Sequence, residues 1–242
     1  MSNFILITGA SSGIGRSISV KLAEKGYQCI LTGRNLEKLR FSLSLLKGDG
    51  HLIFEGDLID DDFQEFICHN IPILSGIVHS AGVIKLMPYK FIKKNDFNEI
   101  MNINFFAPFF LTQRLLKQKK IVDHGSIVFL SSISGPVVGS KGNLMYSASK
   151  SAINGIVKTL ALELAEKKIR VNSISAGMVN TEMWRNDTKI VSTEQLNLNS
   201  KLYPLGFGEP EYIANLASFL ISEESIWITG SSVIADGGFT IQ

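Results

Sequence analysis

The sequence has few of the residues that build disulfide frameworks or metal sites. Among its 242 residues are two cysteines, Cys29 and Cys68, and four histidines. The two cysteines lie in strand-like and helix-like surroundings, so they favour a reducing compartment over a disulfide scaffold or a metal centre. Charge of one sign is also scarce, with 24 Lys and Arg against 22 Asp and Glu. The chain has no basic run of the kind that marks nucleic-acid binding, so we expect no metal and no nucleic-acid partner.

Long apolar runs are absent as well. No stretch approaches the roughly 18 residues that a membrane span requires. The opening residues, MSNFILITG, lack the charged region and the long apolar core of a signal peptide. We therefore expect a soluble cytoplasmic protein that makes no use of a membrane.

The chain does contain a regular alternation of short apolar segments with longer amphipathic ones. Hydrophobic residues make up 45% of the sequence, enough for the core of one large domain spanning 1–242. The predicted strands are 4–8, 27–33, 51–56, 73–82, 125–132, 169–175 and 231–236, and the predicted helices are 14–26, 35–48, 60–69, 96–119, 144–167 and 209–222. Pro108 should kink the fourth helix or mark tight packing. The alternation predicts an α/β, single-domain, doubly wound (Rossmann) fold with a mostly parallel seven-stranded sheet and helices on both faces.

A glycine-rich loop, TGASSGIG, joins the first strand to the first helix. Gly9, Gly13 and Gly15 allow a sharp turn and a close approach of the backbone to a ligand. The helix that follows presents unpaired N–H groups and a positive dipole end to a phosphate. This context indicates a dinucleotide site, although the spacing Gly-x3-Gly-x-Gly differs from the common fingerprint and a tight turn without a ligand is the alternative.

The end of the second strand, LTGRN, bears on the choice of cofactor. An acidic residue there binds the ribose hydroxyls in NAD-binding proteins, whereas this chain has Gly33 followed by Arg34. A guanidinium can pair with a 2′-phosphate that a carboxylate would repel. The sequence thus predicts a preference for NADP(H), with NAD(H) possible, unless Arg34 is an ordinary surface arginine.

The segment YSASK places Tyr146 and Lys150 one helical turn apart, on the same face. An ammonium about 5 Å from the phenol, at an effective dielectric of about 20, would lower the phenol pKa by about two units, to about 8. A phenol with such a pKa is a useful general acid–base. The alternative is an ordinary helix start with a solvated lysine. Upstream, the strand ending LSSISG offers Ser131 or Ser132 to a substrate carbonyl.

Taken with these segments, further motifs resemble the short-chain dehydrogenase/reductase family, from about residue 3 to residue 240. They are GDL at 56–58, SAG at 80–82, NINFFAPF at 102–109, NSISAG at 172–177 and ITGSSVIADGG at 228–238. The resemblance implies hydride transfer between a nicotinamide and a carbonyl or secondary alcohol. The end of the chain is similar to 3-oxoacyl carrier-protein reductases, so a 3-oxoacyl thioester is one expected substrate. Relatives acting on sugars, polyols or other small carbonyls share that ending, and a free carbonyl compound is the alternative.

The resemblance also implies roles for individual residues. Tyr146 would be the acid–base, Lys150 would lower its pKa and hold the nicotinamide ribose, Ser132 rather than Ser131 would polarise the carbonyl, and Asn104 would hold a water that relays protons. The implied cofactor-binding residues are Thr8, Gly9, Ser11, Ser12, Gly13, Ile14, Gly15, Arg34, Asp57, Leu58, Ser80, Ala81, Gly82, Tyr146, Lys150, Gly177, Val179 and Thr181. A cofactor-binding sensor without turnover is a second class of function, which the complete set of Ser, Tyr and Lys disfavours.

Some positions depart from the family pattern. Ser80 and His79 stand where the family usually has asparagine, and Ala176 stands where it has proline. We expect His79 to be a strand-end histidine satisfied by its neighbours. Ser126 occupies a position where 3-oxoacyl carrier-protein reductases tend to carry an arginine for their acidic carrier, while Lys167 or Lys168 keeps a second basic position.

Two regional expectations complete the sequence-based account. Residues 178–206 occupy the place of the family's substrate lid, where Met178, Met183, Trp184, Leu202 and Tyr203 would line an apolar pocket or pin the lid to the core. The family resemblance further suggests a homotetramer packed through the helices at 96–119 and 144–167. A surface apolar stripe on these helices could equally belong to the domain's own core.

Overall fold

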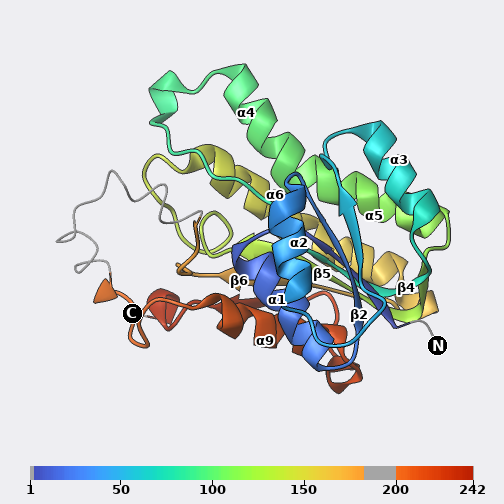
Figure 1. The fold of residues 1–242 in the computed structure, drawn as a ribbon. Helices are drawn as coiled ribbons and strands as arrows, with labels where there is room; N and C mark the ends of the chain where they lie inside the picture. Colours follow the sequence, from blue (N-terminus) through green and yellow to red (C-terminus); the bar gives the residue numbers. More distant parts are fainter. Residues whose placement is uncertain (1–2, 183–199, 242) are drawn as a thin grey trace.

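A computed structural model describes residues 3–182 and 200–241 of the chain. Its centre is one parallel sheet with the strand order β3-β2-β1-β4-β5-β6-β7 (Figure 1). The strands are β1 (Phe4–Thr8), β2 (Gln28–Gly33), β3 (Leu52–Glu55), β4 (Leu74–His79), β5 (Ile121–Ser132), β6 (Arg170–Ala176) and β7 (Ser232–Ala235). The predicted doubly wound, seven-stranded sheet is confirmed.

Helices cover both faces of the sheet. One layer contains α1 (Gly13–Glu24), α2 (Leu36–Ser44) and α9 (Pro210–Ile221), and the other contains α3 (Asp61–Asn70), α4 (Lys94–Met101), α5 (Ala107–Lys117) and α6 (Leu144–Glu163). Single 3-10 turns lie at η1 (Tyr89–Phe91), η3 (Ala165–Lys167), η5 (Glu223–Ser225) and η6 (Phe239–Ile241).

Side chains of the central strands alternate between two hydrophobic cores. In β1, Ile5 and Ile7 pack with α1 and α9, whereas Leu6 packs with α3, α5 and α6. This alternation follows from the two-residue period of a strand. Because both faces are covered, β1 reads in the sequence as an unbroken apolar run, FILIT.

The helix expected at 96–119 is two helices joined by one π turn. The turn, η2, spans Asn102–Phe106 and places the buried Asn104 inside the fold. Pro108 follows immediately, at the start of α5. A proline has no N–H to donate and crowds the preceding turn, so the chain widens before it instead of continuing as a regular helix.

The fifth strand begins four residues earlier than the sequence suggested. Leu74 of β4 pairs with Ile121, but Gly76 pairs with Ser126, so β5 carries extra residues between these two pairings. His124 has a positive φ of 65° within this irregular part. The bulge interrupts the alternation of side chains, so the sequence pattern predicted only the part of the strand that follows the bulge.

All seven strands run the same way, so their carboxyl ends meet at one edge of the sheet. The strand order reverses at β1, which lies between β2 and β4. At such a switch point the connecting segments leave for opposite faces and open a crevice, where ligands of doubly wound folds bind. Over residues 3–182 and 200–241, the structure contains no helix with the length and apolar character that a bilayer span requires.

Candidate active site

The glycine loop after β1 is packed so closely that it excludes larger side chains. Gly9 has a φ of +66°, and a Cβ there would lie 2.7 Å from the Cα of Ala81. A Cβ on Gly15 would lie 2.3 Å from the carbonyl oxygen of Gly9 and 2.5 Å from the hydroxyl of Ser80. Glycine is therefore required at both positions by backbone contact, and not merely by turn flexibility.

The N-terminus of α1 lies at this loop and offers donors to an anion. Ser12 is its N-cap residue, in an extended conformation with a φ of −164°. Within the described part of the chain, the Ser12 side chain makes no capping hydrogen bond and the first turn holds no acidic residue. Leading N–H groups and a positive dipole end that are left uncapped in this way suit a phosphate.

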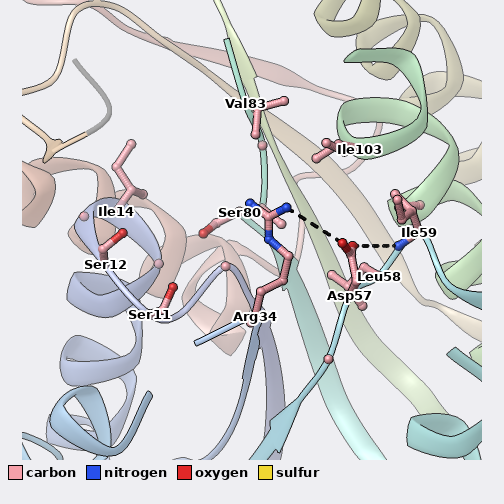
Figure 2. Close-up of a pocket in the computed structure, with 18 of the residues that line it drawn as sticks. Ser11, Ser12, Ile14, Arg34, Asp57, Leu58, Ile59, Ser80, Val83 and Ile103 are labelled. Atoms are coloured by element: carbon pink, nitrogen blue, oxygen red, sulfur yellow. Dashed lines mark hydrogen bonds and ion pairs between the residues drawn. The ribbon is translucent and has the colours of Figure 1, made fainter. Parts of the chain in front are cut away.

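A cavity of about 270 Å³ lies beside this loop (Figure 2). Thirteen of the predicted cofactor-binding residues line it: Gly9, Ser11, Ser12, Gly13, Ile14, Gly15, Arg34, Asp57, Leu58, Ser80, Ala81, Gly82 and Thr181. Six further residues, which were not predicted from the sequence, also line it: Gly33, Gly56, Ile59, Val83, Ile103 and Ala107. Gly33 ends β2, while Gly56 and Val83 follow β3 and β4. Their position at strand ends was the signal that could have identified them.

Arg34 and Asp57 face each other across one end of this cavity. Figure 2 shows the guanidinium extending from the end of β2 toward the carboxylate that follows β3. Arg34 Nη1 lies 3.7 Å from Asp57 Oδ2. The other carboxylate oxygen, Oδ1, accepts a hydrogen bond of 3.1 Å from the backbone N–H of Ile59. The side chains are 65% and 39% exposed, so the pair lies at the mouth of the cavity.

Thr8, in contrast, does not line this cavity. Its hydroxyl oxygen accepts hydrogen bonds from the backbone N–H groups of Ser80, at 3.1 Å, and Ala81, at 3.2 Å. The hydroxyl of Ser80 in turn donates to the carbonyl oxygen of Thr8 at 2.9 Å. Ser80, which departs from the usual asparagine, thus ties the end of β4 to the end of β1. Thr8 shapes the floor beneath the glycine loop rather than reaching a ligand.

A second cavity, of about 380 Å³, adjoins the first one. Ile14, Ser80, Gly82 and Thr181 line both, so the two cavities meet at these residues. The second cavity contains the predicted residues Ser131, Ser132, Tyr146, Lys150, Gly177, Met178, Val179, Leu202 and Tyr203. Met183 and Trp184, also predicted to line the pocket, lie outside the described residues.

Other residues of the second cavity were not anticipated. They are mainly apolar, with a few hydroxyl and amide groups: Ile84, Leu130, Ile133, Ser134, Val138, Ser140, Asn143, Ala176 and Phe239. Of the described residues that line this cavity, Lys150 alone carries an ionisable ammonium or carboxylate. Asn143 lies three residues before Tyr146, and its buried amide donates to the hydroxyl of Ser134 at 3.0 Å.

Ser132 and Tyr146 come together in the second cavity. Ser132, at the end of β5, and Tyr146, in the first turn of α6, line the same wall of this cavity. The Ser132 hydroxyl donates to the carbonyl oxygen of Ala176 at 3.4 Å and is close enough to the phenol to lower the pKa of Tyr146. The backbone N–H of Ser134 donates to Ser132 Oγ at 3.0 Å and fixes its position. The hydroxyl of Ser131 instead donates to the carbonyl oxygen of Lys150 at 3.2 Å. The geometry therefore places Ser132, rather than Ser131, beside the phenol.

Lys150 lies on the same side of α6 as Tyr146, one turn further along. Its ammonium donates to the carbonyl oxygen of Leu130 at 2.8 Å and lies 5.6 Å from the centre of the Tyr146 ring. Burial lowers the pKa of Lys150 from 10.5 to about 8. A buried ammonium that loses its proton this readily is poised to change charge near neutral pH.

The expected lowering of the Tyr146 pKa is not found in the chain by itself. Burial raises the pKa of the phenol above 10, and the hydrogen bond from Ser132 lowers it by a smaller amount. The spacing of Tyr146 and Lys150 reports the attraction between the two groups but not the loss of hydration at the buried phenol. Desolvation of both groups is the larger effect in this cavity. The predicted direction of the Tyr146 pKa shift is therefore wrong.

The side-chain amide of Asn104 spends most of its hydrogen-bonding capacity on protein groups. Its Oδ1 accepts from the backbone N–H of Val83 at 2.8 Å, and its Nδ2 donates to the Val83 carbonyl at 2.9 Å and to Ser149 Oγ at 3.0 Å. Both amide protons are therefore committed. A Cβ on Gly82 would lie 3.3 Å from Asn104 Oδ1 and 3.5 Å from Lys150 Nζ, so these two groups flank Gly82. The side chain fixes the loop after β4 to α6, and has one remaining lone pair for a water.

His79 is buried behind the site rather than inside it. Its Nε2 lies 2.8 Å from Thr112 Oγ1, and its ring stacks on Phe129 with centroids 4.8 Å apart. Burial lowers the pKa of His79 to about 3, so the ring is neutral. Within residues 3–182 and 200–241, its Nδ1 has no hydrogen-bond partner. The expectation that neighbours satisfy His79 is therefore right for one nitrogen and wrong for the other.

Ser126 does not lie where a carrier protein could touch it. It is 1% exposed within β5, and its hydroxyl donates to the carbonyl oxygen of Leu220 at 2.7 Å. Lys167 and Lys168 are exposed, but they precede β6, at the opposite end from the cavities. The seven residues of β6 separate the two ends by about 20 Å.

Comparison with known proteins gives a consistent result. The family model described as enoyl-(acyl carrier protein) reductase matches residues 9–240. A 3-oxoacyl-[acyl-carrier-protein] reductase FabG of Rickettsia bellii is 35% identical over 96% of this chain and 95% of the relative. A glucose 1-dehydrogenase of Gluconobacter oxydans is 34% identical over 98% and 91%, respectively. Among solved structures, a dehydrogenase/reductase from Sinorhizobium meliloti aligns with a TM-score of 0.90 and 29% identity, covering 99% of this chain and 96% of the other.

Proposed function

Because this chain belongs to the short-chain dehydrogenase/reductase family, oxidoreductases that act on CH–OH and C=O groups, we propose that it is an NADP(H)-dependent carbonyl reductase or alcohol dehydrogenase. The observation that carries the proposal is the convergence of Ser132, Tyr146 and Lys150 on one cavity. That cavity adjoins the cavity beside the glycine loop. One cavity would then hold the reacting carbonyl, and the other the adenosine and phosphate end of the cofactor.

The residues around the loop fit a dinucleotide. A Cβ at Gly9 or Gly15 would fill the space beside the loop, and α1 presents an uncapped N-terminus in the part of the chain that the structure describes. We assign the cofactor to the eighteen positions named from the sequence, with Thr8 acting through the floor of the loop. When bound, the nicotinamide supplies or accepts the hydride. Thr181, which packs against Gly13, would close over the phosphates.

Tyr146 is proposed as the proton donor for reduction and the proton acceptor for oxidation. Tyr146 lines the substrate cavity beside Ser132, whose single hydroxyl proton would turn from the Ala176 carbonyl to the substrate oxygen. As negative charge develops on that oxygen, the phenol and the Ser132 hydroxyl would stabilise it as hydrogen-bond donors. The buried position that raises the Tyr146 pKa keeps the proton on the phenol until this charge appears.

Lys150 and Asn104 are proposed to supply and return the proton. Because the Lys150 pKa is about 8, its ammonium can pass a proton toward the phenolate and recover one from solvent at little cost near neutral pH. Asn104 bonds both Val83 and α6, and so fixes the position of Val83 relative to α6 beside Gly82. The water predicted for Asn104 would use its remaining Oδ1 lone pair.

The preference for NADP(H) rests on Arg34. Its guanidinium lies at the end of β2 and lines the loop cavity, where a 2′-phosphate on the adenosine ribose would be placed. An arginine binds a phosphate through charge-assisted hydrogen bonds. Use of NAD(H) is expected to be weaker, since a cofactor without this phosphate leaves the guanidinium with Asp57.

For the substrate, we propose a neutral carbonyl, with a 3-oxoacyl thioester as the first candidate. The cavity around Tyr146 is mostly apolar, and among its described lining residues Lys150 is the sole potential cation. The FabG relatives favour a thioester. The position of Lys167 and Lys168 away from the cavities disfavours a carrier that docks there and delivers its acyl group to the same chain.

A free sugar or polyol is the second candidate. The glucose 1-dehydrogenase relative supports it, as do the hydroxyl and amide groups of Ser134, Ser140 and Asn143 in the cavity wall. Such groups hydrogen-bond hydroxyl-rich substrates. They contribute little to a hydrocarbon chain.

We also propose a homotetramer that packs through α5 and α6, and a cytoplasmic location. A groove of about 420 Å³ runs between these helices, lined by Phe109, Ile156 and Leu160 among others. Phe110 and Leu162 are 41% and 78% exposed on the same helices. Packing of a second copy would cover these side chains.

The test is a turnover panel with both cofactors. Acetoacetyl thioesters of coenzyme A and of carrier protein, acetoacetate esters, glucose and simple ketones are each offered with NADPH or NADH, or the oxidised forms. We expect reduction of the thioesters with NADPH at the highest kcat/KM. Failure on every thioester together with oxidation of glucose would replace the first candidate by the second. Tight NADPH binding with no turnover on any member would favour the sensor.

A further inference from the structure

Resting on the proposed use of NADP(H), we propose that Asp57 sets the cofactor selectivity by competing with the 2′-phosphate for Arg34. The family resemblance implied only that Asp57 is one of the cofactor-binding residues. In the structure its carboxylate is the ion-pair partner of the guanidinium that would bind the phosphate, 3.7 Å away. The role is one of a specificity-determining residue that acts through another side chain.

The backbone fixes both partners of this pair. Gly33 of β2 and Glu55 of β3 are paired in register, and the N–H of Gly56 donates to the carbonyl of Gly33 at 3.0 Å. Arg34 and Asp57 are the residues that directly follow this pairing. The two residues are therefore held on neighbouring strand ends, and Figure 2 shows their side chains joined by the ion pair.

Asp57 is also oriented by its own loop. The hydrogen bond from the Ile59 N–H holds Oδ1, which leaves Oδ2 for the guanidinium. An asparagine at position 57 can keep the first contact through its amide oxygen while losing the charge. The substitution therefore separates the geometry of the loop from its electrostatics.

The phosphate site overlaps the guanidinium side of the pair. A Cβ on Gly33 would lie 3.4 Å from the hydroxyl of Ser11, so the end of β2 touches the glycine loop, and Arg34 comes next. A 2′-phosphate bound between this loop and Arg34 would lie near the Asp57 carboxylate as well. The carboxylate both occupies the guanidinium and repels the phosphate, whereas NADH meets neither effect.

Two other cations near this end are engaged elsewhere. Arg16 donates through Nε to Ser42 Oγ at 2.9 Å and through Nη2 to the carbonyl oxygen of Ser11, and it does not line the loop cavity. Lys38, in the first turn of α2, donates to Glu182 Oε2 at 2.9 Å. This pair connects α2 with the segment that follows Thr181, and neither residue lines the loop cavity. Arg34 is thus the side chain through which Asp57 would act.

The test measures cofactor dissociation constants, which do not depend on turnover. NADPH and NADH are titrated by nucleotide fluorescence against the wild type, Asp57→Asn, Arg34→Gln and the double variant, in about 20 mM salt. We expect Asp57→Asn to tighten NADPH by about three- to fivefold, the size of an exposed ion pair, and to change NADH by less than twofold. In the Arg34→Gln background, Asp57→Asn should change NADPH by less than twofold. At about 0.5 M salt the gain should disappear through screening.

Asp60→Asn is the matched control for a general effect of charge. Asp60 caps α3 through a 2.9 Å hydrogen bond from the Asp62 N–H, and an asparagine caps a helix equally well. This variant should leave both dissociation constants unchanged. Equal changes for NADPH and NADH in Asp57→Asn, or a gain that survives Arg34→Gln, would overturn the role of Asp57 while leaving the proposed function intact. A wild type that binds neither nucleotide would refute both.

Discussion

The ammonium of Lys150 lies 5.6 Å from the centre of the Tyr146 ring, and its hydrogen bond to the Leu130 carbonyl holds it inside the core. Both residues come from the first turns of α6, while Leu130 comes from β5, so the pair is assembled where the helix begins to cross the sheet. The arrangement places the buried ammonium of Lys150 beside the buried phenol of Tyr146. Its energetic consequences can be measured without any substrate.

The buried ammonium should make the free protein less stable than a variant that lacks it. The unfolded chain holds this proton up to a pKa near 10.5, but the folded chain releases it near 8. Folding is therefore disfavoured by about 3 kcal/mol below pH 8, and this cost disappears as the pH rises from 8 to 10.5. We expect Lys150→Met to raise the free energy of unfolding by about 1–3 kcal/mol at pH 7, because loss of the hydrogen bond to Leu130 offsets part of the gain.

Urea unfolding of the wild type and Lys150→Met at pH 7 and at pH 10 provides the measurement. The difference between the two proteins should shrink at the higher pH. Burial also raises the pKa of Cys29 and Cys68, to about 12 and about 11, but these thiols are common to both proteins and cancel in the difference. A difference that stays constant with pH would mean that the lysine is not a destabilised cation.

Asn104 should contribute mainly to stability and to the position of the loop after β4. Removal of its side chain leaves the N–H and carbonyl of Val83 without their partners. We expect Asn104→Ala to lower the free energy of unfolding by about 2–3 kcal/mol, with a fall in kcat larger than the rise in the KM for the cofactor. Asn98→Ala, at an exposed position of α4, is the control and should change stability by less than about 0.5 kcal/mol. Equal stability of the two variants would show that the contacts to Val83 carry little energy.

The glycine loop should tolerate no methyl group at Gly15. An alanine there brings its Cβ to 2.3 Å from the Gly9 carbonyl oxygen, so the loop must move. We expect Gly15→Ala to weaken NADPH by at least about 30-fold and to cost about 1–3 kcal/mol of stability. At Gly139 an added Cβ meets none of the described atoms within 4 Å, so Gly139→Ala should bind NADPH like the wild type. Unchanged NADPH affinity in Gly15→Ala would place the cofactor away from this loop.

The proposed tetramer makes the exposed aromatic residues of α5 part of an interface. A glutamate at Phe110 would place a charge into that contact, so Phe110→Glu should dissociate the assembly into smaller species. Phe66→Glu on α3, where the side chain is 54% exposed, is the matched control and should leave the assembly unchanged. Static light scattering at micromolar concentrations reports the mass. A wild type that is monomeric, or a Phe110→Glu variant of unaltered mass, would contradict the proposed interface.

The sequence predicted the strands well because the central ones are buried on both faces and read as continuous apolar runs. The sequence was less informative where contacts with other elements change the backbone from the regular strand or helix that the hydrophobic pattern predicts. The bulge in β5 hides the alternation around His124, and the π turn that holds Asn104 has no signature beyond the nearby Pro108. Both features depend on contacts with other elements.

For the candidate site, residue identities could be anticipated but their interactions could not. Tyr146 and Lys150 share a helix face, as their spacing requires, yet the direction of the Tyr146 pKa depends on burial, which spacing does not report. Arg34 and Asp57 form an ion pair because β2 and β3 are neighbours in the sheet, and the order of the strands cannot be read from the sequence. The burial of Ser126 likewise depends on how β5 pairs with its neighbouring strands, which the sequence does not report.

Turnover by Tyr146→Phe tests the central claim most directly, because the substitution removes one oxygen atom and leaves the ring in place. The account predicts that kcat with NADPH and the best carbonyl substrate falls at least about 100-fold. The NADPH dissociation constant, measured on the same sample, should stay within about threefold of the wild type. A variant that keeps kcat within threefold of the wild type would show that the phenol is not the proton donor, and the proposed mechanism would be wrong.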